Sequence, residues 1–546
     1  MITKVKRFFA SAPLLLTLSA CGPALPPNTN GVLYCSEGNP ESFNPQMVTS
    51  ATTLDMTSLQ LYDTLVEYDA AKGSLQPGLA TDWQISDDGH TYEFTLRENV
   101  AFHHTDYFTP SRPFNAEDVL FSFQRWLDPE HPYHSVSGGR YPFFRATRLD
   151  QLIASISAPR PNVVRIQLHQ PDSSLMSTLS SSFAVILSAE YGQQLLDKGL
   201  APHIDQRPIG TGPFKFRHFR PDVSVYYQAH QEHWRGAPAS DSLVFRITPS
   251  NHKRMLMLLT GDCDISPYPP ARDIAWLQQR DDMNVQQSLS PNTAFWAFNT
   301  EVPPFDNPLV RKALSHAIDR DALIHSVYHD HAVRADSILP HTSWAQLALP
   351  DAYQYDPEKA RALLAEAGYA DGFSMDIWAL PVQRSYNPNP RLMAEQIQSY
   401  LAQIGVTANI VSYEWRSFRR LLAQGKHDSV LIGWSADHSD PDNFFRPILT
   451  CAAKRSINNR ALWCNAEFDA LVTAAIRTTD ISKRQLLYER AQKLLAEQVP
   501  IVPLAHSIRY QVSRRTVRNM LPPSLSGIRF HAVYSDHGLM EEAAHD

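Results

Sequence analysis

The sequence predicts an α/β protein, and three observations support this fold class. Strand-like and helix-like patterns alternate along most of the chain, which is typical of α/β folds. The segment 355–434 contains the succession β-α-β-α-β, whose parallel strands require right-handed crossovers. The chain has 546 residues, 43% of them hydrophobic, which is enough to bury large cores and too much for one compact domain of ordinary size.

The first clear element is a β-hairpin. Apolar and polar residues alternate on both sides of Asp88-Gly89, a pair that favours a tight turn with positive φ. The alternating apolar residues are Trp83, Ile85, Tyr92, Phe94 and Leu96. Further along the chain, Asn307-Pro308 predicts the start of a helix. The apolar face of that helix comprises Ala313, Leu314, Ala317 and Ile318.

The segment 355–434 predicts a connected unit. Asp356-Pro357 has the residue types of a helix start, with Asp as the cap and Pro in the first position, and Gly368 suits the helix exit. The apolar face between them comprises Ala360, Leu363, Leu364 and Ala367. The elements that follow are a strand near 374–380, a helix opened by Asn389-Pro390, a strand near 406–411, a helix near 415–424 and a strand near 429–434.

Two loops follow strands of this unit, namely 381–389 and 435–443. In open α/β sheets, ligands bind beyond the carboxyl ends of the strands. The first loop contains Arg384 and the second contains Asp437, so the two loops carry charges of opposite sign. The sequence therefore predicts a ligand site at this edge of the sheet, with charges that suit the two ends of a zwitterion.

The first residues predict a secretory signal. Lys4, Lys6 and Arg7 form a positive head, and the mostly apolar stretch 8–18 is too short to span a bilayer comfortably. The stretch ends in Leu-Ser-Ala before Cys21, which resembles the lipobox of bacterial lipoproteins and implies cleavage before Cys21 and a diacylglycerol on its sulfur. The alternative is an ordinary signal peptide that happens to end in a Cys. Which membrane would hold the lipid stays open.

The remaining four cysteines predict disulfides, because an even count in an exported chain favours pairing over free thiols. Cys451 with Cys464 would close a short loop, which stabilises the fold by about 3 kcal/mol. Cys35 would then pair with Cys263 and join the start of the mature chain to a distant segment. The competing interpretation is a metal site, which no Cys-x-x-Cys spacing supports.

Composition and motifs argue against several function classes. The net charge is only −7 and the chain has no long Lys/Arg run, so neither a nucleic-acid surface nor a polybasic membrane patch is indicated. No Gly-x-Ser-x-Gly and no Walker phosphate loop is present. His230-Gln-Glu-His233 lacks the His-Glu-x-x-His order of metalloproteases, and we expect it to cap a surface element. We therefore predict a protein that is not an enzyme and uses no cofactor.

Several motifs together resemble family 5 of the bacterial solute-binding proteins. These motifs are Phe43-Asn44-Pro45, PIGTGPF (208–214), FNT (298–300), NPLVR (307–311) and YDPEKA (355–360). LPVQRSYNPN (380–389), GWSADHSDPDNFF (433–445) and the four cysteine positions resemble the dipeptide-binding members most. SILPHTSWA (337–345) also resembles the peptide-binding component of an antimicrobial-peptide-sensitivity transporter. Haem- and glutathione-binding lipoproteins belong to the same subfamily, so the ligand stays open.

The resemblance implies a two-lobed periplasmic binding protein with an extra domain inserted in the first lobe and a ligand cleft between the lobes. Crossing strands would lie near 289–300 and 505–515. The implied division is a signal peptide (1–20), a lipidated tether (21–30), lobe I (31–60, 207–289 and 508–546), an inserted domain (61–206) and lobe III (290–507). A monomer of this kind would deliver short peptides to the permease subunits of an ATP-driven importer.

The resemblance also assigns ligand-binding residues. Arg384 matches an arginine that holds a peptide carboxylate, which a planar guanidinium can meet through two parallel hydrogen bonds. Asp437 matches an aspartate that pairs with the α-ammonium group. Tyr386 and Trp434 lie beside these two charges and would supply a hydroxyl and an apolar wall. Thr49 and Ser50 match a ligand-facing stretch near the N-terminus, and Tyr141 matches an aromatic residue on the inserted domain.

Some neighbouring residues have structural alternatives. Asp440 and Asp442 lie in Asp-Pro-Asp-Asn, which predicts turn and helix-capping roles. Trp434 is equally typical of a core residue at a strand end. His438 lies next to Asp437, which keeps an axial ligand for haem open.

Overall fold

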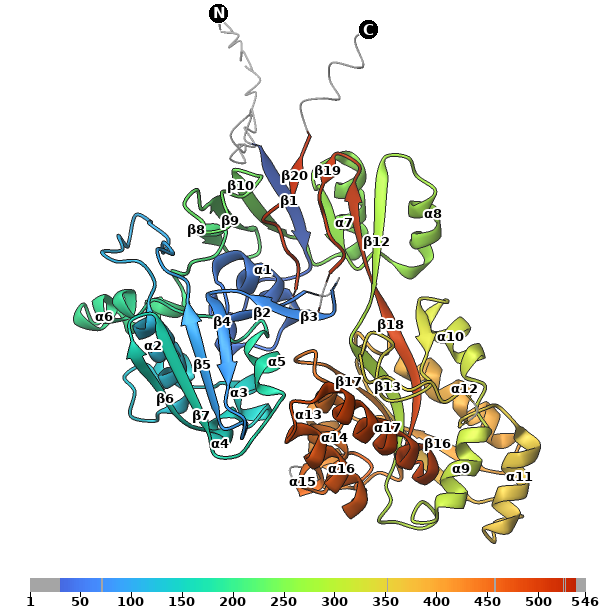
Figure 1. The fold of residues 1–546 in the computed structure, drawn as a ribbon. Coiled ribbons are helices and arrows are strands. Elements are labelled where there is room, and N and C mark those ends of the chain that lie inside the picture. Colours follow the sequence, from blue (N-terminus) through green and yellow to red (C-terminus); the bar gives the residue numbers. More distant parts are fainter. Residues whose placement is uncertain are drawn as a thin grey trace, which may run out of the picture.

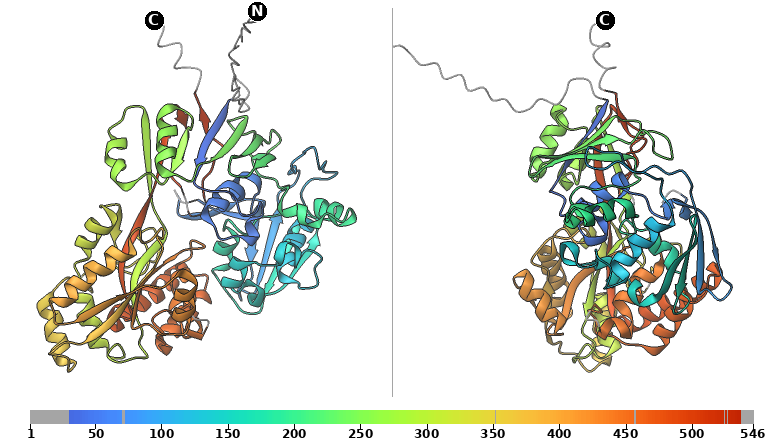
Figure 2. Two further views of the ribbon diagram at one scale, coloured as in Figure 1. Left: turned by 180° about the vertical axis from the view of Figure 1, so that it is seen from behind. Right: turned by 90° about the vertical axis from the view of Figure 1, so that its left-hand side faces the viewer.

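A computed structural model describes residues 30–69, 72–350, 352–455, 458–523, 525 and 527–536. The expected signal peptide, Cys21 and nearly all of the tether lie outside this range. The described chain forms two lobes, with an inserted domain packed beside the first (Figure 1). Figure 2 shows the same arrangement from behind, with lobe III and the inserted domain side by side below lobe I. The predicted two-lobed α/β architecture is confirmed.

Lobe I is built on one end of a large mixed sheet, in the order β18-β11-β1-β10-β9-β8. Within this part, β1 and β10 pair in parallel. Its strands are β1 (Gly31–Ser36), β8 (Phe214–Arg220), β9 (Ser224–Ala229), β10 (Ser242–Ile247), β11 (Ile265–Pro267) and β12 (Met283–Leu289). Its helices are α1 (Ala51–Leu61), α7 (Asn251–Thr260) and α8 (Ile274–Gln278), and β19 (Val517–Arg518) pairs with β20 (Tyr534–Ser535) nearby.

The inserted domain has its own four-stranded sheet in the order β4-β5-β7-β6. Its strands are β4 (Ala80–Ile85), β5 (Thr91–Leu96), β6 (Ile153–Arg160) and β7 (Val163–Leu168), preceded by the hairpin β2 (Val66–Asp69) and β3 (Ser74–Pro77). Its helices are α2 (Ala116–Leu127), α3 (Pro142–Ala146), α4 (Leu149–Leu152), α5 (Leu175–Leu179) and α6 (Ala189–Asp197). The hairpin predicted at Asp88-Gly89 is present as β4 and β5, and Gly89 has a φ of 70°.

Lobe III is built on the other end of the large sheet, in the order β16-β15-β17-β13-β18. Its strands are β13 (Asn292–Phe298), β14 (Ala332–Arg334), β15 (Ser374–Ala379), β16 (Thr407–Val411), β17 (Ser429–Ser435) and the first part of β18 (Ile501–Arg514). Its helices are α9 (Pro308–His316), α10 (Arg320–Tyr328), α11 (Pro357–Glu366), α12 (Pro390–Ala402), α13 (Trp415–Ala423), α14 (Arg446–Leu449), α15 (Cys451–Arg455), α16 (Ala466–Ile476) and α17 (Ile481–Gln498).

The predicted β-α-β-α-β unit is confirmed. Strand β15 pairs in parallel with both β16 and β17. The side chains of Asn307, Asp356 and Asn389 each accept a hydrogen bond from a backbone N–H in the first turn of α9, α11 and α12, and a Pro follows each cap. The helix starts were therefore readable from two-residue signals.

The two lobes are joined where β18 changes its partner. Ile508 of β18 pairs with Leu289 at the end of β12, and Ala505 pairs with Ala294 in β13. One long strand thus runs from lobe III into lobe I beside the β12–β13 connection (Figure 1). These positions fall inside the two predicted crossing segments.

The hydrophobic cores follow a different division from the strands. One cluster contains Val32 and Tyr34 of lobe I together with Tyr92 and Phe94 of the inserted domain. Lobe III has separate clusters on the two faces of its sheet, since Trp296 belongs to one and its neighbours on β13 to the other. Lobe I and the inserted domain therefore share a core that lobe III does not.

Both predicted disulfides are present. Cys35 is joined to Cys263 with a Cα–Cα distance of 5.9 Å, and Cys451 to Cys464 with a distance of 4.5 Å. Among the described residues, none of the helices combines the length and apolar character that a membrane crossing needs.

Candidate functional site

A cavity of about 890 Å³ lies between the lobes, within the size range of ligand pockets. Lobe I and the β2–β3 hairpin contribute one wall, the β12–β13 connection the back, and lobe III the opposite wall. The lining includes Glu67, Arg235 and Arg529 on the lobe I side and Leu289 and Pro291 at the β12–β13 connection. On the lobe III side it includes Pro340, Ala436, His438 and Phe444.

The two predicted ligand loops meet at the carboxyl edge of the lobe III sheet. Strands β15 and β17 are adjacent and parallel, so the loops after them leave the sheet at the same edge. The ring of Tyr386, from the first loop, lies on Gly433 in β17, where an added Cβ would come within 2.4 Å of Tyr386 Cδ2. Glycine at 433 therefore permits the contact that brings the two loops together.

Arg384 occupies a tight turn of the first loop. Its backbone N–H and C=O exchange hydrogen bonds with those of Asn387, both 3.0 Å long, and the Asn387 side chain is buried. The hydroxyl of Tyr328 donates to the Tyr386 carbonyl at 2.7 Å. The backbone of the loop is thus anchored, whereas the Arg384 side chain is exposed.

The Arg384 guanidinium acts on the pKa of the nearby Tyr386 hydroxyl. Burial raises the pKa of Tyr386 to about 12, and nearby Arg384 opposes that rise. The hydroxyl therefore stays protonated at neutral pH and is available as a hydrogen-bond donor.

Asp437 lies in a more enclosed position. It is half-buried, and desolvation raises the pKa of its carboxyl to about 7, although a hydrogen bond with the Asn443 side chain lowers it. The Asp437 N–H donates to Asn443 Oδ1 at 3.1 Å, and Trp434 Nε1 donates to the same oxygen at 2.9 Å. Trp434 therefore has a structural hydrogen bond beside Asp437 as well as a place in the core.

The short 3-10 helix η5 (Pro441–Phe444) supports this arrangement. The Asp440 side chain caps it by accepting from the Asp442 N–H at 3.0 Å and pairs with Arg484 at 2.8 Å. Asp442 pairs with Arg446 at 2.6 Å. The predicted turn and capping role of Asp440 is confirmed, and Asp442 is an ion-pair partner.

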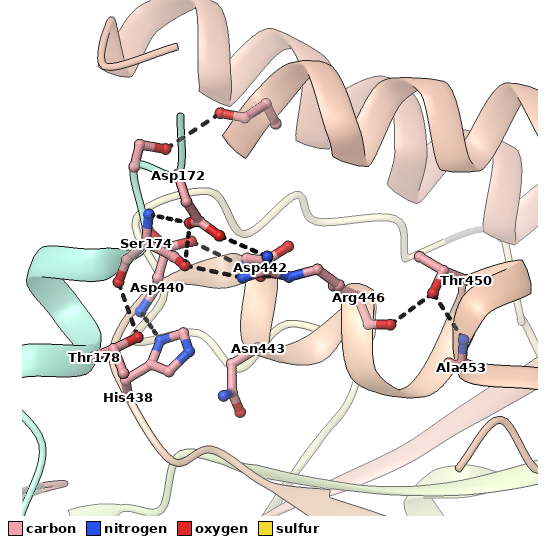
Figure 3. Close-up of polar contacts among 12 residues, drawn as sticks. Asp172, Ser174, Thr178, His438, Asp440, Asp442, Asn443, Arg446, Thr450 and Ala453 are labelled. Carbon is pink, nitrogen blue, oxygen red and sulfur yellow. Dashed lines mark hydrogen bonds and ion pairs between the residues drawn. The ribbon is translucent and has the colours of Figure 1, made fainter. Parts of the chain in front are cut away.

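Arg446 also contacts the inserted domain, as Figure 3 shows. Its guanidinium lies 2.6 Å from Asp172 Oδ2 and donates to Ser174 Oγ at 3.0 Å. Burial raises the pKa of the Asp172 carboxyl, but Arg446 and Ser174 outweigh that effect and leave it lowered. Sequence reasoning missed this contact, because the two residues are 274 positions apart and no motif links them.

His438 is buried beside Asp437 and lines the cavity. Its Nδ1 accepts from the Asp440 N–H at 3.3 Å, and burial lowers its pKa to about 4. The ring is therefore neutral at physiological pH.

Arg384 and Tyr386 lie on the loop after β15, and Trp434 and Asp437 lie at the end of the adjacent strand β17 and just beyond it, with Tyr386 packed on Gly433 between them. None of the four lines the cavity directly, although Ala436 and His438 on either side of Asp437 do. Ser50 caps α1 through a hydrogen bond from the Thr53 N–H, and Thr49 before it is exposed. Neither residue belongs to the cavity lining.

The expected ligand contact of Tyr141 is wrong in this structure. The side chain is only 1% exposed, within the core of the inserted domain. Its hydroxyl accepts from Arg125 Nε at 3.3 Å and donates to the His134 carbonyl at 2.9 Å. Tyr141 thus supports the buried Arg125–Asp205 ion pair instead of facing a ligand.

The expectation that His230 and His233 cap a surface element is also wrong. Both rings are buried, and His233 Nε2 lies 3.9 Å from the buried carboxylate of Asp63. Sequence patterning missed their burial because His is compatible with both environments. The described residues contain no cluster of three or more His, Cys, Asp or Glu arranged to hold a metal ion.

Comparison with known proteins identifies the family. The model of the bacterial extracellular solute-binding proteins, family 5, matches residues 74–456. The chain belongs to this family. As a family 5 protein, it is a member of a group of binding proteins, and the predicted resemblance is confirmed.

The similarity to individual relatives extends over nearly the whole of this chain. It is 40% identical over 518 residues to the dipeptide-binding protein of Escherichia coli, covering 95% of this chain and 97% of the relative. It is 39% identical over 545 residues to heme-binding protein A of Haemophilus influenzae, and the match covers 98% of this chain and 100% of that relative. The crystal structure of a dipeptide-binding protein from Pseudoalteromonas in complex with Met-Leu has a TM-score of 0.79 at 45% identity, covering 93% of this chain and 100% of that one.

Proposed function

We propose that this protein captures dipeptides or other short peptides between its lobes and delivers them to the membrane permease of an ATP-driven importer. The observation that carries the proposal is the pair of oppositely charged loops at one sheet edge, held together by the Tyr386–Gly433 contact. The 40% identity to a dipeptide-binding protein supports the same ligand class.

The two charges would recognise the ends of a small zwitterion. The termini of an extended dipeptide lie about 6–7 Å apart, given the reach of the backbone. Asp437 would accept the α-ammonium group and Arg384 would hold the carboxylate through two hydrogen bonds. A longer peptide would leave one charge unpaired in a desolvated site, which costs several kcal/mol.

Side-chain tolerance would follow from the size of the cavity. At about 890 Å³, it has room for water around a dipeptide, and water can satisfy different side chains without large loss of affinity. Micromolar binding requires only about −8 kcal/mol, which two charge pairs and backbone hydrogen bonds can supply after association costs. Selection for length with little selection for side chain is therefore expected.

Closure of the lobes would turn binding into a signal for the importer. A ligand that contacts both lobes stabilises the closed state through its differential affinity. The domain division stated above and the crossing at Leu289–Ala294 fit such a hinge. We further propose that the protein is a monomer in the periplasm, anchored by a lipid on Cys21.

Haem is a second candidate ligand. The 39% identity to a heme-binding protein favours it, and His438 on the cavity wall offers an imidazole. Its Nδ1 already accepts a hydrogen bond, so only Nε2 would be available as an axial ligand. A shifted visible absorption band on haem titration, lost in His438→Ala, would support this candidate, and an unchanged haem spectrum would exclude it.

Calorimetry with di-, tri- and pentapeptides tests the peptide proposal. We expect dipeptides to bind most tightly and Arg384→Ala and Asp437→Ala each to weaken binding about tenfold or more, which is about 1.4 kcal/mol. If neither substitution weakens the binding of any peptide by that factor, the site assignment is wrong. Purified protein that hydrolyses these peptides would overturn the assignment as a binding protein.

A further inference from the structure

We propose that Asn443 is a positioning residue for the ammonium subsite, where its single amide orients both Trp434 and Asp437. This inference rests on the proposed function, because it specifies how the subsite for the peptide's α-ammonium group is held. Asn443 is assigned no contact with the ligand itself.

The geometry gives the amide two tasks, and the electrostatics of Asp437 give it a third. Asn443 Oδ1 accepts from Trp434 Nε1 at 2.9 Å and from the Asp437 N–H at 3.1 Å. Both donors point at one atom, which fixes that atom as the oxygen and leaves the NH₂ group for the Asp437 carboxyl. The hydrogen bond between the Asn443 side chain and that carboxyl lowers the Asp437 pKa against the effect of burial. An amide is suited to this position because it carries an acceptor and donors on one planar group.

Asn443 is itself firmly held. It is 3% exposed and lies in η5, next to two ion pairs. Asp440 and Asp442 precede it in the chain, and they pair with Arg484 and Arg446 respectively. Figure 3 shows the Asn443 side chain beside this network, which continues through Arg446 to Asp172 of the inserted domain. A side chain with these restraints can fix the directions of its neighbours.

The charged groups near Asp437 are paired with one another, and the neutral side chain of Asn443 is the one that bonds to Asp437. Asp440, Asp442 and Asp172 are paired with Arg484 and Arg446, and of these three burial raises the pKa of Asp442 to about 7. The adjacent His438 has a pKa of about 4 and is neutral. Burial raises the Asp437 pKa and the hydrogen bond from the Asn443 side chain opposes that rise, so the amide favours the ionised carboxylate.

Asn443→Asp tests the effect of the Asn443 NH₂ group on Asp437 while keeping an oxygen that can accept from Trp434. The variant keeps an oxygen acceptor for Trp434 and the Asp437 N–H but replaces the NH₂ donor with a second acceptor. We expect dipeptide affinity at pH 7 to fall about tenfold or more, and the pH at which affinity is half-lost to rise by about one unit. Asn443→Ser, which adds no charge, should shift the same midpoint upward by a smaller amount and serves if the Asp variant does not fold.

Two further measurements decide whether Asn443 acts through Asp437. In the Asp437→Asn background, Asn443→Asp should cause little further loss of affinity, and equal loss in both backgrounds would overturn the inference. The matched control is Asn465→Asp, the same exchange at the N-cap of α16, for which we expect unchanged affinity and an unchanged pH midpoint.

The ligand-free protein distinguishes failure of this inference from failure of the proposed function. Carboxyl NMR should show a higher pKa for Asp437 in Asn443→Asp and Asn443→Ser than in the wild type. If the Asp437 pKa is unchanged in both variants, the positioning role is wrong even when peptides bind. If no peptide binds the wild type but the pKa rises, the proposed function fails and the positioning of Asp437 stands.

Discussion

The two loops at the carboxyl edge of the lobe III sheet carry opposite charges in different environments. In the loop after β15, the backbone is fixed by the Arg384–Asn387 hydrogen bonds while the Arg384 side chain is exposed. In the loop after β17, the carboxyl of Asp437 is desolvated enough to titrate near pH 7 and is bonded to a buried amide. One charge therefore lies in a partly desolvated position beside hydrogen bonds that hold its loop, and the other is accessible to water.

This difference assigns different tasks to the two ends of a ligand. A partly desolvated carboxylate gains more from an incoming ammonium group than an exposed one does, because it loses less water on binding and the local screening is weaker. An exposed guanidinium gains less per contact, is screened by salt and can adjust its side chain to the ligand. We therefore expect the amino end to dominate affinity and the carboxyl end to tolerate more variation.

The largest effect should come from Asp437→Asn. This variant is nearly isosteric and removes the charge that would pair with the ammonium group in an enclosed site. We expect dipeptide affinity to fall about a hundredfold or more, which is about 2.7 kcal/mol. Calorimetry at pH 7.5 measures the loss, with thermal unfolding as the control for folding. A smaller loss than that of Arg384→Ala would reverse the comparison between the two loops.

The pH dependence of dipeptide affinity should reflect the ionisation of the Asp437 carboxyl. Asp437 has a raised pKa of about 7 in the ligand-free protein, and a bound ammonium favours its ionised form. Binding therefore releases a proton below pH 7, so affinity should fall by up to about tenfold for each unit of pH below 7 and level off above it. Measurements should stop near pH 8, where a peptide's α-amino group begins to deprotonate.

Another carboxyl titrates in the same window and needs a control. Burial raises the pKa of Asp442 to about 7, although Arg446 opposes the rise. If Asp437 is responsible, the residual affinity of Asp437→Asn should vary little between pH 5.5 and 7.5. A pH profile that persists in this variant would assign the effect to Asp442 or to another group.

A smaller effect is expected from Arg384. Arg384→Ala should weaken dipeptide binding about tenfold, and Arg384→Lys should restore only part of it because an ammonium cannot make two parallel hydrogen bonds to one carboxylate. The loss should shrink when dipeptides are replaced by their C-terminal amides. Full restoration by Lys would mean that the charge alone matters and that the planar geometry does not.

The elements of this comparison were predictable from the sequence, but their environments were not. Asp356-Pro357 and Asn389-Pro390 marked helix starts by local chemistry, and parallel pairing of the strands then put both loops at one edge. The environment of Asp437 includes the Asn443 side chain, which accepts from the Asp437 N–H and from Trp434, and these hydrogen bonds depend on the path of η5. A residue type and its neighbours in sequence do not determine that path.

The errors have a related physical cause. Tyr141 was placed by resemblance and the histidines at 230 and 233 by pattern, and both residue types suit a wet surface as well as a satisfied interior. The disulfide of Cys35 with Cys263 was recoverable because four cysteines allow few pairings. The contact of Asp172 with Arg446 was not, since ion pairs between distant segments have many candidate partners.

The smallest effect on affinity should come from Asp172→Asn, which tests whether the inserted domain stiffens the loop after β17. The variant removes one carboxylate from Arg446 but leaves Asp442 as its partner, so the guanidinium stays paired. We expect a loss of about 1–3 kcal/mol in the free energy of unfolding, as for a charge-assisted hydrogen bond, and a change in dipeptide affinity of about threefold or less. Amide hydrogen exchange should increase in 436–446 and stay unchanged in 380–389, because only the former loop is connected through Arg446 to the inserted domain. Equal changes in the two loops would show that they are not held independently, and the contrast between a preorganised and an adaptable end of the site would then be lost.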